Sequence, residues 1–398
     1  MLRAPAATLL ASIVSLCLMT AHTASAEDYP LVLGYDLSTR SAALGGASNA
    51  LFWGEELNSW GNPALLGEAR GIRFTTSHMA VSPFLTDRAS FQSSDLVLGG
   101  EGLGLVFSGR PRGLGRVVLD YGAQPVLGPG GYPTTFADAF ESVDSWGFGV
   151  SVLQAIRATS RLWGADFPRH DRFDVSLGMN FKNIATQHLY GYPQTTRARD
   201  WGILLRATPV NNMGNASRLP ARFDLAGGIS VLTYNDDATL PGIDGPTPIS
   251  QHARLGASAR VALDPPQLVR ASQQESPLAS WLDGLRPLLS VGLTTDREVR
   301  GTRYTTTERY TGWGAEVTIA RVFSVRRGHT VDKGRYWPLE GSTSGWSVGL
   351  PVGRWAGFMV EDARFPQPRG SVVGTLHRRA TVAWLDFIAF ARSRHHPV

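Results

Sequence analysis

The chain has 398 residues, of which 43% are hydrophobic, 10% aromatic and only 18% charged, with a formal net charge of +5. This apolar and aromatic content excludes a disordered chain, and the charged fraction is below the roughly 25% of a typical soluble domain. The positive charge is nearly all arginine, spread along the chain beside Asp and Glu without a basic stripe, so we expect no nucleic-acid partner.

Residues 1–26 have the pattern of a cleavable secretory signal. Arg3 precedes an apolar run at 6–19, and Ala24-Ser25-Ala26 supplies a small-residue cleavage site. The only cysteine, Cys17, lies in this run, so we expect no disulfide and no catalytic thiol in the mature chain. No later apolar run approaches the ~18 residues of a transmembrane helix. The sequence therefore predicts an exported β-protein, either soluble or an outer-membrane barrel.

Residues 27–70 do not alternate and form a separate segment before the strands. Residues 40–49 are small and glycine-rich, and 52–66 are dense in aromatic residues with a turn signal at Asn62-Pro63. Residues 41–51 are compatible with a short helix. We predict a plug, or hatch, inside a barrel, because a periplasmic linker would not need so many aromatic residues. The plug motif is Gly45, Gly46, Asn62, Pro63 and Ala64, and the candidate contacts for a hydrophobic ligand are Phe52, Trp53, Leu57 and Trp60.

From residue 71 onward the dominant signal is strict alternation of apolar and polar residues. In 172–183, for example, Phe173, Val175, Leu177, Met179 and Phe181 alternate with polar or small neighbours. Successive side chains of a strand point to opposite faces, so each segment has one apolar and one polar face. A soluble sandwich also alternates, but segments of 8–12 residues with a polar face rich in Gly, Ser, Arg, Asp and Asn favour a membrane barrel with a polar interior.

The predicted fold is all-β: a 14-stranded antiparallel transmembrane β-barrel over 71–398. The candidate strands are 71–79, 102–109, 115–122, 145–154, 172–183, 199–207, 221–232, 252–263, 287–295, 311–319, 321–328, 343–350, 354–363 and 377–391. An even number of strands places both termini on the periplasmic side. The longer connections then lie on the extracellular side, and short turns such as 110–114 and 351–353 lie on the periplasmic side. The connections 155–171, 208–220 and 264–286 are long for periplasmic turns.

Four tryptophans support this register. Trp146, Trp201, Trp313 and Trp346 fall near the start of even-numbered predicted strands, at the outer end of the barrel. A ring of aromatic residues is expected at that interface, so we predict an aromatic girdle. A simple preference of Trp for strands would explain the residues but not the shared end.

Catalytic and metal-binding patterns were weighed against this reading. Gly345-Trp-Ser347-Val-Gly349 matches G-x-S-x-G, but Ser347 lies in an alternating strand and not in the strand–turn–helix setting of a nucleophile. The nine histidines show no metal-ligand spacing, and no phosphate loop or dinucleotide motif is present. We therefore expect no cofactor and no enzymatic activity, although a lumen assembled from distant residues leaves an enzyme as a third class.

The segment before the strands carries a resemblance to a known family. Arg40-x-x-Ala-Leu-Gly-Gly-Ala-Ser48 with Trp60-Gly-Asn-Pro-Ala-Leu-Leu66 resembles the N-terminal signature of the PorV/PorQ family, a branch of the FadL-like outer-membrane barrels with fourteen strands and an N-terminal hatch. Further patches are similar in family order: 173–184, 200–204, 313–317, 323–328, 345–350 and 374–378. The long stretch at 264–287 and the continuation past Phe390 to Val398 depart from the family pattern.

The resemblance implies two competing functions. PorV/PorQ proteins are similar to components of type IX secretion, which implies outer-membrane lipid, secreted cargo proteins and secretion-system subunits as partners. FadL-like barrels pass hydrophobic small molecules, which implies a transport channel instead. The prediction from sequence is secretion or surface presentation of cargo in the outer membrane, with transport as the alternative.

Overall fold

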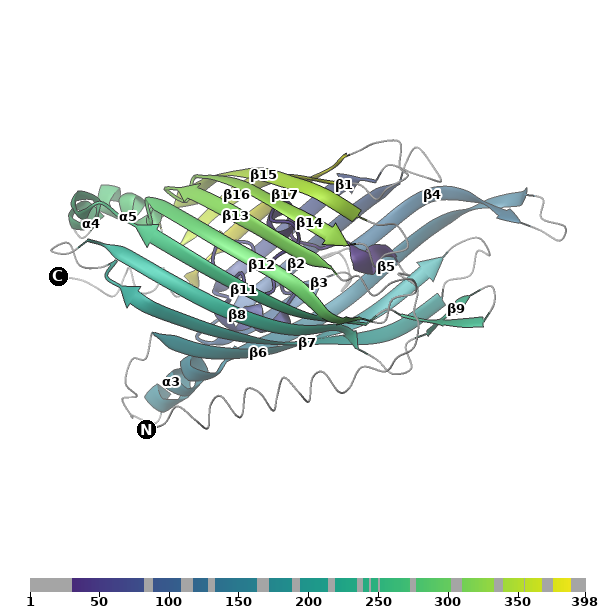
Figure 1. The fold of residues 1–398 in the computed structure, drawn as a ribbon, viewed down its shortest axis with the longest axis horizontal. Helices are drawn as coiled ribbons and strands as arrows, with labels where there is room; N and C mark the ends of the chain where they lie inside the picture. The colour runs from purple at the N-terminus through teal and green to yellow at the C-terminus, as the bar shows by residue number, and fades with distance from the viewer. Residues whose placement is uncertain are drawn as a thin grey trace.

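A computed structural model gives the fold of the chain, shown in Figure 1. It describes residues 31–81, 89–108, 117–127, 133–162, 172–187, 194–213, 219–234, 239–242, 245–249, 251–272, 277–301, 310–332, 339–353, 355–366 and 375–387. None of the helices in these ranges is long and apolar enough to cross a membrane.

The described strands form one closed antiparallel barrel, because β1 pairs with β17 on one side and with β2 on the other. A separate hairpin consists of β9 (Thr239–Gly242) and β10 (Gly245–Pro248). The wall strands are β1 (Gly71–Ala80), β2 (Ser90–Gly99), β3 (Leu103–Ser108), β4 (Val117–Leu127), β5 (Pro133–Ser151), β6 (Phe173–Gln187), β7 (Gln194–Asn211), β8 (Ala221–Tyr234), β11 (His252–Leu263), β12 (Leu289–Gly301), β13 (Thr311–Ile319), β14 (Phe323–Asp332), β15 (Leu339–Val352), β16 (Ala356–Pro366) and β17 (Thr375–Leu385).

Strands β3 and β4 share one position in the wall. Both lie between β2 and β5: β3 pairs with one half of each neighbour and β4 with the other half. The described residues of β3 end at Ser108, and those of β4 begin at Val117. Counting β3 and β4 as one position, the described wall has fourteen positions, which confirms the predicted fold class.

Two of the individual strand predictions were wrong, and the errors cancel in the count. Residues 102–109 and 115–122 were predicted as consecutive strands but are collinear, and β2 was missed inside the predicted loop 80–101. In β2 the apolar face changes along the strand. Phe91 points inward near one end, whereas Leu96 and Leu98 point outward near the other. A strand whose apolar face switches has no continuous period-two signal.

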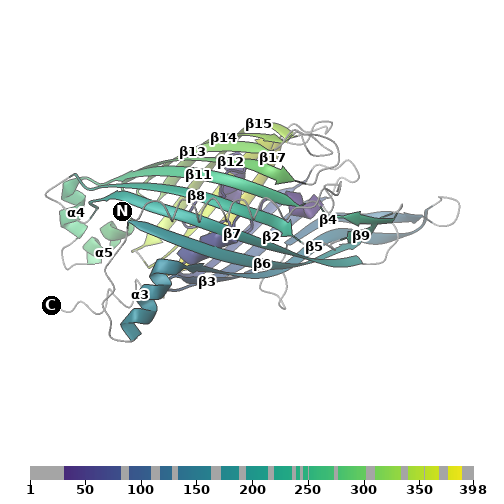
Figure 2. The ribbon, with the colours of Figure 1, turned by 60° about the horizontal axis from the view of Figure 1, so that its bottom comes forward.

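The two ends of the barrel differ. At one end, called the turn end, the connections include the short turns 100–102 and 320–322. The same end carries α3 (Val152–Leu162), α4 (Pro266–Ser272) and α5 (Pro277–Gly284), as Figures 1 and 2 show. The long connections predicted at 155–171 and 264–286 thus contain helices. At the opposite end, called the loop end, β4, β5 and the β9–β10 hairpin extend farthest (Figure 2).

The outward face of the wall carries an apolar band that reaches from the turn end partway along the strands. On β6 it runs from Phe173 to Phe181, and the next outward residue is Asn183. Those nine residues are the length that a tilted strand needs to cross a bilayer, roughly 9–11 residues. Beyond this level the strands continue toward the loop end with polar residues outside. The band is a surface that an apolar solvent would cover.

The four predicted girdle tryptophans mark the upper edge of this band. Each is the last apolar outward residue before a polar one two positions farther toward the loop end; these polar residues are Asp144, Arg199, Thr311 and Ser344. Three of the tryptophans are strongly exposed, and Trp201 is partly covered. Only Trp313 lies near the start of its observed strand, because β5, β7 and β15 begin earlier than predicted.

We expect Val291→Arg to destabilise the barrel by about 2–4 kcal/mol, because Val291 lies in the band and an arginine there would face hydrocarbon. Thr295→Arg is the matched control, since Thr295 faces outward on the same strand just beyond the band. Urea unfolding in lipid vesicles measures both. Equal stability of the two variants would contradict a lipid-facing band.

Candidate functional site

Residues 31–68, called the N-terminal segment, lie against the inward side of the wall. The segment contains η1 (Leu31–Gly34), α2 (Thr39–Ala43) and η2 (Pro63–Glu68). Its α2 contacts β14 to β17, and η2 contacts β2, β3 and β5 to β7, so the segment reaches strands on different sides of the barrel. Figure 1 shows its purple elements among the wall strands. Most of its residues are fully buried.

Inward-facing glycines of the wall make this close approach sterically feasible. A Cβ on Gly178 would lie 2.3 Å from the carbonyl carbon of Pro63, and a Cβ on Gly228 would lie 2.3 Å from the carbonyl oxygen of Asn49. The described wall strands have eleven such glycines whose added Cβ would come within 3.0 Å of the segment: Gly104, Gly149, Gly178, Gly202, Gly228, Gly256, Gly292, Gly312, Gly314, Gly328 and Gly345. Several are direct ladder partners, as in the row Gly104, Gly149, Gly178 and Gly202. Sequence reasoning did not find this set. Its only signal was one glycine per strand on the polar face.

Polar side chains of the wall bind the backbone of the segment, which has little secondary structure of its own. The Asp296 carboxylate accepts from the amides of Ser48 and Asn49, both at 2.9 Å. Further side chains donate to segment carbonyls: Asn180 to Ser59, Ser258 to Ala50, Thr294 to Ala47, Tyr310 to Gly45 and Thr343 to Ala43. Buried backbone groups need such partners. The polar interior is therefore complementary to this one segment.

A buried charge network joins the segment to the wall. Arg40 of α2 forms two hydrogen bonds to Glu316, Nε to Oε2 at 2.8 Å and Nη2 to Oε1 at 2.6 Å. Glu316 also pairs with Arg326 at 2.6 Å, and Arg326 pairs with Glu361 at 2.8 Å. All four side chains are almost fully buried.

The carboxylate of Glu56 stabilises the start of α2 within the segment. It accepts hydrogen bonds from the amides of Thr39 and Arg40, at 3.0 and 2.9 Å. Burial raises the pKa of Glu56 well above its usual range, and the neighbouring Glu361 raises it further.

The five residues of the predicted plug motif lie at tight contacts. Gly45 and Gly46 have φ of 74° and 77°, a left-handed conformation that favours glycine. Asn62 caps η2 by accepting from the Ala64 amide, and it donates to the Asn49 carbonyl at 2.7 Å. Pro63 begins η2, where a missing amide hydrogen costs nothing. Their role in closing a pore remains a prediction.

The four predicted ligand contacts do not lie together. Phe52 and Trp53 pack with Leu44, Leu65 and Leu204, whereas Leu57 packs with Leu66, Val97 and Val106. Trp60 belongs to a third cluster, and the Lys182 ammonium lies 3.6 Å from its ring centroid. One shared pocket for all four is therefore not formed.

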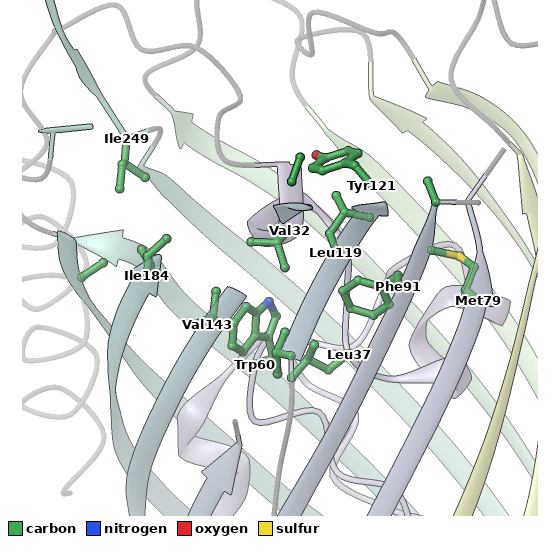
Figure 3. Packing of buried hydrophobic residues seen from close by; sticks show 14 of the residues in the cluster. Val32, Leu37, Trp60, Met79, Phe91, Leu119, Tyr121, Val143, Ile184 and Ile249 are labelled. Atoms are coloured by element: carbon green, nitrogen blue, oxygen red, sulfur yellow. The ribbon is translucent and has the colours of Figure 1, made fainter. Parts of the chain in front are cut away.

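The cluster around Trp60 is apolar and lies inside the barrel toward the loop end. Figure 3 shows Val32, Leu37 and Trp60 of the segment facing wall residues. The wall contributes Met79, Phe91, Val117, Leu119, Tyr121, Val143, Ile184, Ala198 and Leu376. On β6 the inward face changes from Asn180 and Lys182 to Ile184 as the outward face becomes polar. Along β6 the inward face is thus polar at the level of the band and apolar at Ile184 above it.

A groove of about 680 Å³ lies at the upper edge of the apolar band, over β3, β5, β6 and β7. The outward aromatic rings of Phe107, Trp146 and Phe181 line it, with Arg197 and Arg199 among its polar residues. Trp146 stacks on Phe181 with ring centroids 4.5 Å apart. This volume is in the usual range of small-molecule sites, roughly 300–1,000 Å³.

No protein-family model and no curated protein matches the sequence. Solved structures that are similar include a Pseudomonas aeruginosa FadL homologue, with 9% identity, coverage of 88% of this chain and 98% of that one, and a TM-score of 0.43. The Ralstonia pickettii toluene transporter TbuX has 11% identity, coverage of 87% and 96%, and a TM-score of 0.40. The Pseudomonas putida toluene transporter TodX has 12% identity, coverage of 92% of this chain and 100% of that one, and a TM-score of 0.43. These values are too low to transfer a substrate or mechanism.

We expect Arg40→Met to destabilise the packed segment by about 3–5 kcal/mol, because it removes one partner of a buried ion pair. The double variant Arg40→Met/Glu316→Gln should recover part of this loss, since the uncompensated charge is also removed. Limited proteolysis of the segment in detergent micelles, at increasing urea, measures its release. Wild-type behaviour of Arg40→Met would show that the pair does not hold the segment.

Proposed function

We propose that the protein is an outer-membrane barrel that conducts hydrophobic small molecules, with the N-terminal segment as its plug. The apolar band, bounded by Trp146, Trp201, Trp313 and Trp346 as a girdle, supports membrane insertion. Closure of the barrel satisfies the backbone groups of the wall in lipid. An export signal at 1–26 fits this location and lies outside the described residues.

The observation that carries the proposal is the placement of two apolar surfaces on the two sides of one wall position. Inside, Val117 and Val143 belong to the buried cluster around Trp60. Outside, Phe107 and Trp146 line the groove. Between them the described residues of β3 end at Ser108 and those of β4 begin at Val117. We infer that a hydrophobic molecule entering at the loop end is held by the inner cluster and leaves toward the groove.

Transport is preferred to the secretion role that the PorV/PorQ resemblance implies. A small molecule needs only local displacement of side chains such as Val32, Leu37 and Trp60. Passage of a folded cargo domain would require release of the whole segment from its ion pairs and its contacts with the glycine row. The secretion role could also consist of cargo binding at the loop end without passage through the barrel. A pull-down with secreted proteins would reveal such binding.

The plug role predicts that Gly178→Val raises ionic conductance in planar bilayers, because the added side chain displaces Pro63 and loosens η2. Gly227→Val is the matched control, since the nearest heavy atom to its added Cβ is 4.0 Å away. Heat-dependent migration in electrophoresis checks that both barrels fold. A folded, silent Gly178→Val channel would argue against a plug.

The transport role predicts that Val143→Arg reduces uptake by about tenfold or more, because a charge in the apolar cluster repels a hydrophobic solute. Ser142→Arg introduces the same residue at the adjacent, outward position. Cells lacking the native protein and expressing each variant are supplied with a labelled fatty acid and a labelled monoaromatic hydrocarbon. Uptake that is independent of the barrel, or unaffected by Val143→Arg, would refute the proposed function.

A further inference from the structure

The apolar band has no polar border at the turn end. At each described wall position the outward residue nearest this end is apolar: Ile72, Leu98, Leu103, Val150, Phe173, Val210, Ala221, Leu263, Leu289, Ile319, Phe323, Val352, Ala356 and Leu385. At the loop end, by contrast, polar outward residues follow the band. The lower boundary between hydrocarbon and water must therefore fall at the level of the turn-end connections, where α3 and α5 lie.

Helix α3 presents an apolar side away from its attachment to the barrel. It continues directly from β5, and the Asp174 carboxylate accepts from the Leu153 amide at 3.1 Å. Gln154 donates to Glu68 of the N-terminal segment at 3.4 Å, so this side of the helix faces the interior. Ile156 lies on another side and is 40% exposed. Figure 2 shows α3 leaving the wall beside β3 and β6.

Helix α5 is held against the rim at a second place. Arg321 donates to the Gly284 carbonyl at 3.2 Å, and a Cβ on Gly284 would lie 2.3 Å from the carbonyl oxygen of Gly353. Arg286, just after the helix, pairs with Asp264 at 2.8 Å. These contacts fix the helix, yet Trp281 is 46% exposed.

We propose that α3 and α5 lie in the headgroup region of the phospholipid leaflet at the turn end, with Ile156 and Trp281 inserted among the lipids. Helix α3 contacts β5 and β6, whereas α5 contacts β15 and the turn residues Arg321 and Gly353, so one surface that surrounds the barrel reaches both helices at separate parts of the rim. Exposed apolar side chains beside a polar, attached face are typical of interfacial helices, and Trp is enriched at this depth. The inference rests on the proposed membrane insertion.

Nitroxide labels on single cysteines test this proposal. Ile156→Cys and Trp281→Cys are made with Cys17, the only native cysteine, absent or replaced, and Val317→Cys serves as a reference within the band. Ala158→Cys, on a different side of α3, is the matched control. The purified variants are placed in vesicles of phosphatidylethanolamine and phosphatidylglycerol, and power saturation compares collisions with oxygen and with a water-soluble nickel complex.

Labels at 156 and 281 are expected to favour oxygen by about tenfold relative to the label at 158, with a depth between those of position 158 and position 317. Water-accessible labels at 156 and 281, with a lipid-exposed label at 317, would overturn the helix docking while leaving the barrel in the membrane. A water-accessible label at 317 would instead refute membrane insertion itself. Spin–spin broadening that disappears on dilution with lipid would assign these helices to contacts between copies of the chain.

Discussion

The architecture depends on how closely the backbone of the N-terminal segment approaches the inner wall. At Gly178, Gly202 and Gly228 the space that a side chain would need is already occupied by Pro63, Asn62 and Asn49. Protein interiors are closely packed and contain few voids. This close approach therefore requires glycine at successive positions around the wall. The requirement explains why the polar face of the strands is rich in glycine, and why a water-filled pore is not needed to account for it.

The change of polarity along the interior follows from the same arrangement. At the level of the band, the segment brings its backbone groups and Arg40 to the wall, and these need polar partners such as Asp296, Asn180 and Glu316. Above the band, Val32, Leu37 and Trp60 of the segment pack in one cluster with Ile184, Val143 and Phe91 of the wall. Along β6 the inward face becomes apolar at Ile184, close to Trp60, and the outward face becomes polar at Asn183, at about the same level.

Alternation along the strands was sufficient to predict the fold class, because one face of most strands keeps a single character over the band. It failed in β2, where Phe91 and Leu98 point to opposite sides, and it divided the β3–β4 position into two. The N-terminal segment was recognised from its small and aromatic residues, but the wall residues that it contacts could not be predicted. Arg40 and Glu316 are 276 residues apart, and no local pattern relates them. The outward placement of the four predicted girdle tryptophans could be read from the sequence because each lies in a regularly alternating strand.

The buried charges and the apolar contacts of the N-terminal segment differ in how they would respond to a displacement of the segment. A buried ion pair contributes little net stability compared with well-packed apolar residues, since desolvation offsets most of the attraction between the charges, but breaking one partner away is costly. The network from Arg40 through Glu316 and Arg326 to Glu361 therefore acts chiefly on geometry, fixing α2 in one place on the wall. The apolar contacts of Val32, Leu37 and Trp60 lack that directional requirement and can re-form around a hydrophobic solute. Under the proposed transport role, a segment anchored by charges at the level of the band and packed by apolar contacts above it would admit a solute at the loop end without losing its position lower in the barrel.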